Sequence, residues 1–256
     1  MEFSHLSYDV VDSIAEISLQ RPPVNALNLE MIREIVDAVN RAAEDPKVRA
    51  VIFASNVPRR FCAGLDLNLI LDQPSDHIHN VLKSLYIDLY DAQYKLGKPS
   101  IAAVDGAARG GGMTIGVSCD VVIASEQATF GYPEIEVGLI PGIHFTHLPR
   151  IVGRHRAFEL LFSGRAFPAT EAQSLGIVSK VVESGEAMAS ARVLARSFAA
   201  KSPTVMRLGR AAFMRANDLD YRRSIESAVD SLCTIAGTDD AREGLRAFKE
   251  NRKPRW

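Results

Sequence analysis

The chain of 256 residues lacks a dominant charge, a disulfide framework and a long apolar run. Thirty Lys and Arg residues stand against 31 Asp and Glu residues, which gives a net charge of -1 and no electrostatic case for binding nucleic acid or a membrane surface. The three cysteines, Cys62, Cys119 and Cys233, are widely spaced, so they indicate free thiols in a reducing compartment and no zinc site. No stretch reaches ~18 apolar residues, and the N-terminus has no signal-peptide core. We therefore expect a soluble, cytoplasmic protein without a metal.

What the chain does have is 47% hydrophobic residues, enough for one large domain, with no internal repeat. Apolar runs predict strands and helical spacing of apolar residues predicts helices, and the two alternate through the first half of the chain. Asn28 is typical of a helix N-cap. The alternation predicts an α/β core with a parallel sheet. The predicted strands are 10–19, 49–55, 100–104 and 121–124, and the predicted helices are 29–44, 78–96 and 113–119.

From about Arg154 the pattern becomes mainly helical. A single strand is predicted in this part, over 178–182. We expect residues 1–200 to form the core and residues 201–256 to form a C-terminal helical region. The predicted helices are 157–162, 170–174, 186–200, 204–215, 219–235 and 239–251.

Two glycine-containing segments carry the strongest functional signal. One is Phe61-Cys62-Ala63-Gly64-Leu65-Asp66, and the other is the run from Asp105 to Gly112, which ends in three glycines. The second segment opens a predicted helix, where unpaired N–H groups and the positive end of the helix dipole are available to a ligand. Two such N–H groups converging on one oxygen would form an oxyanion hole. The sequence therefore favours a reaction that passes through an enolate or another oxyanion.

These segments, taken with others in the same order, resemble the crotonase superfamily, the enoyl-CoA hydratase/isomerase family. The resemblance extends over nearly the whole chain. It is carried by the segments 21–27, 61–66, 110–112, 119–120, 130–134, 138–141, 242–244 and 247–248. It implies the ClpP/crotonase-like α/β fold, a spiral of ββα units followed by a C-terminal helical trimerisation region. It also implies a homotrimer or homohexamer.

The resemblance assigns roles to individual residues. The backbone N–H groups of Leu65 and Gly111 would hold the thioester oxygen of an acyl-CoA substrate. Coenzyme A is expected only as part of this substrate, and no separate cofactor is expected. The path of the coenzyme would be formed by Val24, Ala26, Ala63, Leu65, Asp66 and Phe248. Asp66 is also a candidate structural cap.

The acid/base residues differ from those of the family's hydratases, which use two glutamates. The glutamate that closes the Phe-Gly-x-Pro-Glu segment is present as Glu134, but the other position is Thr114. A hydroxyl cannot act as a base near neutral pH because its pKa is too high. A single carboxylate can still move a proton from C2 to C4 of an acyl chain, so the sequence favours a 3,2-enoyl-CoA isomerase with Glu134 as base.

Several alternatives stay open. Thr114, a histidine or Glu136 could complete a hydratase or dehydratase. The chain also departs from the family after Pro141, where His144 and His147 stand in a segment that we expect to be a loop and that is usually glycine-rich. Glu136 would face the same side as Glu134 in an extended segment. Decarboxylation, thioester hydrolysis and a hydratase-lyase reaction are further options, and a non-catalytic acyl-CoA or RNA binder is the least favoured.

Overall fold

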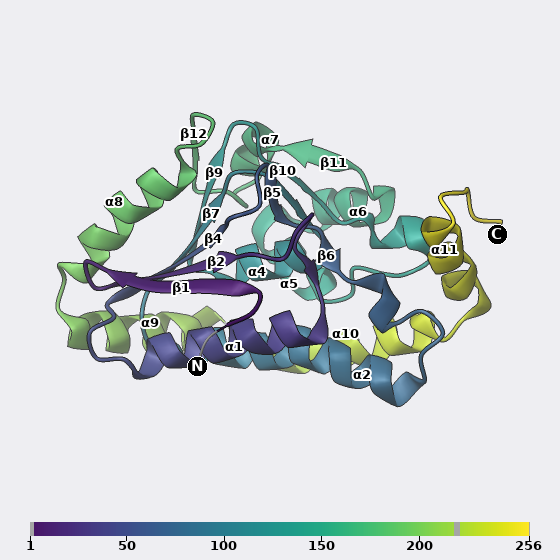
Figure 1. The fold of residues 1–256 in the computed structure, drawn as a ribbon, viewed down its shortest axis with the longest axis horizontal. Coiled ribbons are helices and arrows are strands. Elements are labelled where there is room, and N and C mark those ends of the chain that lie inside the picture. The colour runs from purple at the N-terminus through teal and green to yellow at the C-terminus, as the bar shows by residue number, and fades with distance from the viewer. Residues whose placement is uncertain (1–2, 218–220, 256) are drawn as a thin grey trace.

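A six-stranded sheet forms the centre of the molecule in the computed structural model, which describes residues 3–217 and 221–255 (Figure 1). The first two strands are antiparallel and the others pair in parallel. Buried strands in a parallel sheet are almost wholly apolar, as β4 and β7 are here. The predicted α/β class is confirmed. In spatial order the strands are β1 (Leu6–Val11), β2 (Ile14–Leu19), β4 (Ala50–Ser55), β7 (Ser100–Val104), β9 (Val121–Ser125) and β12 (Lys180–Val182).

The prediction of one strand over 10–19 is wrong, because the chain reverses direction within it. Asp12 and Ser13 have φ values of 51° and 65°, the left-handed conformation that a two-residue hairpin requires. Val11 therefore pairs with Ile14, and β1 lies along the edge of the sheet.

Two smaller sheets complete the strand layers. A strand of the large sheet is followed by a strand of the second sheet and then by helical structure, three times in succession, beginning at β4, β7 and β9; in the first of these units the short strand β6 lies between β5 and the helical structure. This order is the expected spiral of ββα units. The second sheet contains β11 (Ala166–Pro168), β10 (Thr129–Gly131), β8 (Ala107–Arg109) and β5 (Arg60–Cys62), and the third pairs β3 (Ala26–Leu27) with β6 (Gly64–Leu65).

Helix α1 (Leu29–Glu44) has the predicted bounds. The side chain of Asn28 accepts a hydrogen bond from the N–H of Met31 at 2.8 Å, which confirms the predicted cap. Its apolar stripe, including Ile32 and Ile35, is buried in the main core.

The predicted helix over 78–96 is not a single α-helix. It consists of α2 (Ser75–Lys83), a π-helical turn η2 (Ser84–Asp88) and α3 (Leu89–Lys95). Hydrophobic spacing cannot detect the extra residue of a π turn, and such turns are frequent at functional sites. The turn carries Leu85 and Tyr86, both buried.

Helices enclose the large sheet. Helix α8 (Ala187–Ala199) packs small residues, Ala187, Ala191 and Ala195, against one face, and the main core lies on the other face. In Figure 1 α8 lies apart from the layer that contains α1, α2 and α10. The other helices are η1 (Leu67–Leu69), α4 (Gly111–Ser118), η3 (Pro133–Val137), α5 (His144–Val152), α6 (Arg154–Ser163), α7 (Ala169–Ser174), α9 (Pro203–Asn217), α10 (Tyr221–Ala236) and α11 (Asp239–Lys249).

The C-terminal part is helical as predicted, although residue 219, where one helix was expected to begin, lies outside the described residues. The division at residue 200 stays a prediction. Within the ranges 3–217 and 221–255, no helix is long and apolar enough to cross a membrane. In that same part of the chain, no three His, Cys, Asp or Glu side chains are grouped so that they could hold a metal ion.

Candidate active site

A cleft of about 750 Å³ lies between the glycine-containing segments, η3 and α11. All the residues predicted to bind coenzyme A line it, and so do three of the four predicted catalytic residues. The fourth, Thr114, does not. These lining residues are Val24, Ala26, Ala63, Leu65, Asp66, Gly111, Glu134 and Phe248. Their roles in binding and catalysis stay predictions.

The two predicted oxyanion donors lie next to each other. A methyl carbon built on Gly64 would lie 3.3 Å from the nitrogen of Gly111, and one built on Gly111 would lie 3.5 Å from the nitrogen of Leu65. The N–H of Asp66 donates to the carbonyl of Leu27 in β3, at 3.0 Å. Successive N–H groups of a strand point in opposite directions, so the N–H of Leu65 points away from β3. Gly111 begins α4, so its N–H has no partner within the helix.

No side chain fits between β6 and the N-terminus of α4, where the two backbones approach each other. Gly64 has a φ of 99°, and a methyl carbon there would lie 3.0 Å from the carbonyl oxygen of Arg109. A methyl carbon on Gly112 would lie only 2.4 Å from the carbonyl oxygen of Cys62. Glycine is therefore required for the backbone of β6 to reach the N-terminus of α4.

The carboxyl group of Glu134 lies beside the N-terminus of α4. A methyl carbon on Gly110, which has a φ of 47°, would be 2.9 Å from Oε1 of Glu134. The Oε2 atom is buried and has no hydrogen-bond partner. Burial disfavours the charged form and raises the pKa of Glu134 from 4.5 to about 7. A carboxyl group with this pKa can both take up and release a proton near neutrality.

Glu136 does not form a second carboxylate beside Glu134, although both line the cleft. The segment 133–137 is the 3₁₀ helix η3 and not extended, so residues two apart point in different directions. The side chain of Glu136 is exposed and lies against Gly164, where a methyl carbon would be 3.1 Å from its Cγ. The expectation of a shared side depended on an extended backbone, and the structure contradicts it.

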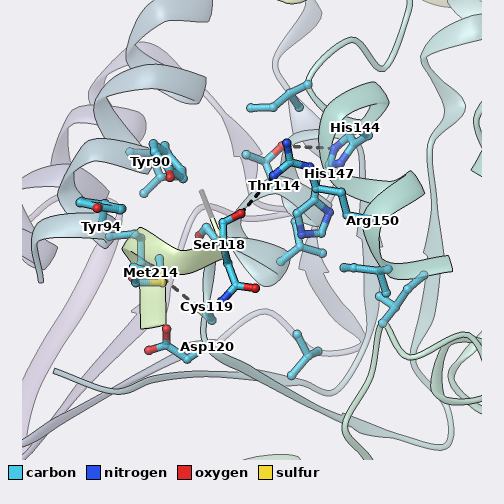
Figure 2. Close-up of a pocket in the computed structure, with 18 of the residues that line it drawn as sticks. Tyr90, Tyr94, Thr114, Ser118, Cys119, Asp120, His144, His147, Arg150 and Met214 are labelled. Atoms are coloured by element: carbon cyan, nitrogen blue, oxygen red, sulfur yellow. Dashed lines mark hydrogen bonds between the residues drawn. The ribbon is translucent and has the colours of Figure 1, made fainter. Parts of the chain in front are cut away.

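Thr114 faces a second, smaller cavity of about 450 Å³ on the other side of α4 (Figure 2). Its Oγ1 lies 3.4 Å from Nε2 of His144, and both side chains are buried. Burial lowers the pKa of His144 to about 3, so the ring is neutral at physiological pH. Tyr86 lines both the cleft and the cavity.

His144 belongs to a helix that sequence reasoning missed. The segment after Pro141 was expected to be a loop, but α5 begins at His144. In Figure 2 His144, His147 and Arg150 project from this helix toward the cavity. The ring of His144 packs against Tyr132, with centroids 4.5 Å apart. The signal that could have found α5 is the spacing of the apolar residues Phe145, Leu148 and Val152, which are three and four residues apart.

The mouth of the cleft is held by polar contacts. Asp66 accepts from the N–H of Asn68 at 3.2 Å, so it caps η1, and it also pairs with Arg21 at 3.1 Å. Asp66 therefore acts as a structural cap, as was predicted. Basic side chains that line the mouth include Arg21, Lys249 and Arg252.

Comparison with known proteins shows the family to which the chain belongs. The model of the enoyl-CoA hydratase/isomerase family matches residues 9–256. The chain belongs to that family. It is 36% identical over 245 residues to a probable mitochondrial enoyl-CoA hydratase 2 of Arabidopsis thaliana, covering 94% of this chain and 80% of the relative. It is 34% identical to the crotonyl-CoA hydratase of Syntrophomonas wolfei, covering 99% and 98%.

Solved structures of the family share the fold. An enoyl-CoA hydratase/isomerase from Xanthobacter autotrophicus superposes with a TM-score of 0.88 at 30% identity, covering 98% of each chain. An enoyl-CoA hydratase from Mycobacterium avium subsp. paratuberculosis also gives 0.88, at 26% identity, covering 100% of this chain and 99% of that one. The crotonase fold and the assignment as an enzyme of the crotonase superfamily are therefore confirmed.

Proposed function

We propose that this enzyme isomerises 3-enoyl-CoA to 2-enoyl-CoA, with Glu134 as the only acid/base group. The observation that carries the proposal is the environment of Glu134. Its carboxyl group is buried, has a pKa of about 7 and lies beside Gly110 at the start of α4. The position where the family's hydratases have a second glutamate is occupied by Thr114, which cannot replace a carboxylate base.

The proposed reaction follows from the geometry of the cleft. Ionised Glu134 removes a proton from C2 of the acyl group, and the thioester oxygen becomes negative. The N–H groups of Leu65 and Gly111 stabilise that oxygen, a contribution of ~3 kcal/mol for each donor in comparable enzymes. The protonated Glu134 then returns the proton to C4, which moves the double bond. Water is not consumed.

The test uses 3-hexenoyl-CoA carrying deuterium at C2, with crotonyl-CoA as a parallel substrate for hydration. A single carboxyl group should deliver part of the label to C4, and the Glu134→Gln variant should lose turnover while still binding the substrate. The exposed Glu136→Gln variant is the matched control and should keep the wild-type rate. Complete loss of label to solvent, or an active Glu134→Gln variant, would contradict the shuttle.

Hydration is the second candidate. The contact between Thr114 and the neutral ring of His144 favours it, because the two side chains together could hold a water molecule where the second glutamate is missing. The names of the two relatives described above, both hydratases, are consistent with it. A Thr114→Val variant should lose hydration of crotonyl-CoA and keep isomerisation if both reactions occur.

We further propose that acyl-CoA lies along Val24, Ala26, Ala63 and Asp66, and that the enzyme assembles as a trimer or hexamer. Basic residues at the mouth of the cleft can meet the phosphate groups of coenzyme A. Exposed aromatic side chains on α5 and α6 support self-association, since Phe145, Phe158 and Phe162 stack on one another at the surface. Sedimentation velocity would measure the assembly, and a monomer would contradict it.

A further inference from the structure

Asn25 is a fully buried polar residue in the loop between β2 and β3, with an exposed fraction of 0%. Its φ of 54° lies in the left-handed region, which asparagine tolerates better than most residues. Its Oδ1 accepts a hydrogen bond from the N–H of Arg21 at 2.7 Å. Its Nδ2 donates to Oγ of Ser55 at 2.8 Å and to the carbonyl oxygen of Phe61 at 2.9 Å. Asn25 therefore joins a loop that lines the cleft to the end of β4 and to β5.

The thiol of Cys62 continues this network toward the predicted oxyanion donors. It donates to the carbonyl oxygen of Asn25 at 3.1 Å, and its sulfur accepts from the N–H of Gly64 at 3.5 Å. Burial raises the pKa of Cys62 to about 12, so the thiol stays protonated and can donate. Gly64 directly precedes Leu65 in the sequence. The side chain of Cys62 thus joins the Asn25 loop to the segment that presents the Leu65 N–H.

Cys62 also contacts the segment that carries the other predicted donor. A methyl carbon on Gly112 would lie 2.4 Å from the carbonyl oxygen of Cys62 and 2.8 Å from its Cβ. Cys62 is itself fully buried. It is therefore packed between Asn25, β6 and the start of α4, and a shift of Cys62 would change the distance between the N–H groups of Leu65 and Gly111.

Backbone hydrogen bonds hold the residues on either side of Gly64 and Leu65. The N–H groups of Ala63 and Asp66 donate to carbonyl oxygens of the loop and of β3, both at 3.0 Å. Between them Gly64 has a φ of 99°, and glycine has more conformational freedom than any other residue. The hydrogen bond from its N–H to the sulfur of Cys62 restricts the rotation that would turn the Leu65 N–H away from a bound thioester.

We propose that Asn25 and Cys62 act together as positioning residues, which hold the Leu65 N–H where it meets the thioester oxygen. Neither lines the cleft, so Asn25 acts through Cys62, and Cys62 acts through Gly64. The proposal rests on the proposed binding of an acyl-CoA thioester between Leu65 and Gly111, and it does not depend on which proton transfer follows. Because a displacement of about 1 Å can cost about 100-fold in rate, loss of these bonds should lower kcat about 10- to 100-fold with KM unchanged.

Cys62→Ser and Cys62→Ala are the matched pair that tests the thiol. Both variants leave a similar space in the core, but only the serine hydroxyl can donate to Asn25 and accept from Gly64. We expect Cys62→Ala to show the full loss of kcat and Cys62→Ser to recover most of it. Asn25→Gly keeps the left-handed backbone and removes the side-chain hydrogen bonds, so it should resemble Cys62→Ala.

The direct measurement is the stretching frequency of the thioester carbonyl of bound hexanoyl-CoA, by infrared difference spectroscopy with an isotopic label at the carbonyl carbon. Donors at the thioester oxygen weaken the C=O bond, so the wild type should move the band to lower frequency than in free hexanoyl-CoA. Cys62→Ala and Asn25→Gly should lose part of this shift, and Cys62→Ser should keep it. Val39→Ala, which truncates a buried residue of α1, controls for reduced stability. It should lower Tm and keep the full shift.

A wild-type shift and kcat in both Cys62→Ala and Asn25→Gly would overturn the proposal, and so would an equal loss in Val39→Ala. If Asn25→Gly does not fold, the two Cys62 variants decide the question. An unshifted band in the wild type would overturn the positioning role together with the predicted donors. A wild type that shows the shift, with the expected order among the variants, but no isomerisation would refute the proposed reaction and leave the positioning role intact.

Discussion

The raised pKa of Glu134 predicts that its carboxyl group destabilises the folded protein at neutral and alkaline pH. In the unfolded chain its pKa is 4.5, and in the folded protein it is about 7. Below pH 4.5 the group is protonated in both states and has no effect. Between the two values only the unfolded state loses the proton, so stability falls as the pH rises. The 2.5-unit difference corresponds to about 3 kcal/mol, at about 1.4 kcal/mol per unit.

The perturbation that reveals this effect is Glu134→Gln, which removes the charge at nearly constant shape. The variant should equal the wild type in stability near pH 4.5 and should exceed it by about 3 kcal/mol at pH 8. For a chain of this size that difference corresponds to a rise in Tm of roughly 6–12 °C. Thermal unfolding of both proteins from pH 4.5 to 8 measures it.

The control variant is Glu136→Gln, which changes an exposed carboxylate on the same 3₁₀ helix. It should shift Tm little and equally at all pH values, since surface charges contribute little. If Glu134→Gln and the wild type have parallel Tm curves across this pH range, the carboxyl group is not desolvated in solution and the reasoning is refuted.

Three further predictions concern rate and stability. kcat/KM for isomerisation should rise about tenfold per pH unit below pH 7 and level off above it, because only ionised Glu134 accepts a proton; a flat profile from pH 5 to 8 would exclude this base. Gly64→Ala should lower kcat about 10²- to 10³-fold in a steady-state assay, because it moves the Leu65 donor. Gly185 has a similar φ but open space around it, so Gly185→Ala should leave kcat unchanged. Arg210→Met should destabilise the protein by about 1–3 kcal/mol in urea unfolding, because it leaves the buried carbonyl oxygen of Gln93 without its donor and removes the ion pair with the partly exposed Asp120.

Elements with a local cause were predictable from the sequence. Helix α1 begins and ends as expected because Asn28 caps it and its apolar stripe has a regular period. The buried strands β4 and β7 stand out as short apolar runs bounded by polar residues. The positions of Gly64, Gly111 and Glu134 around one cleft followed from the resemblance to the family.

Other features depend on contacts that the sequence does not show. The hairpin at Asp12 and Ser13 needs a left-handed conformation at two residues that are not glycine. The π turn at Ser84–Asp88 shifts the helical register by one residue, which the spacing of apolar residues conceals. The separation of Glu136 from Glu134 follows from the 3₁₀ conformation of η3, and an extended segment would have placed them together.

The packing of α11 against η3 makes the position of Glu134 dependent on a helix that is distant in the sequence. A methyl carbon on Gly244 of α11 would lie 2.4 Å from the carbonyl oxygen of Val137, and one on Gly138 would lie 2.9 Å from Cα of Ala241. The two backbones are therefore in direct contact, three to four residues from Glu134. During synthesis the ribosome must release more than a hundred residues after Glu134 before α11 can support it. A nascent chain that ends before Asp239 thus holds the glycine segments and the glutamate but lacks the helix that packs against η3.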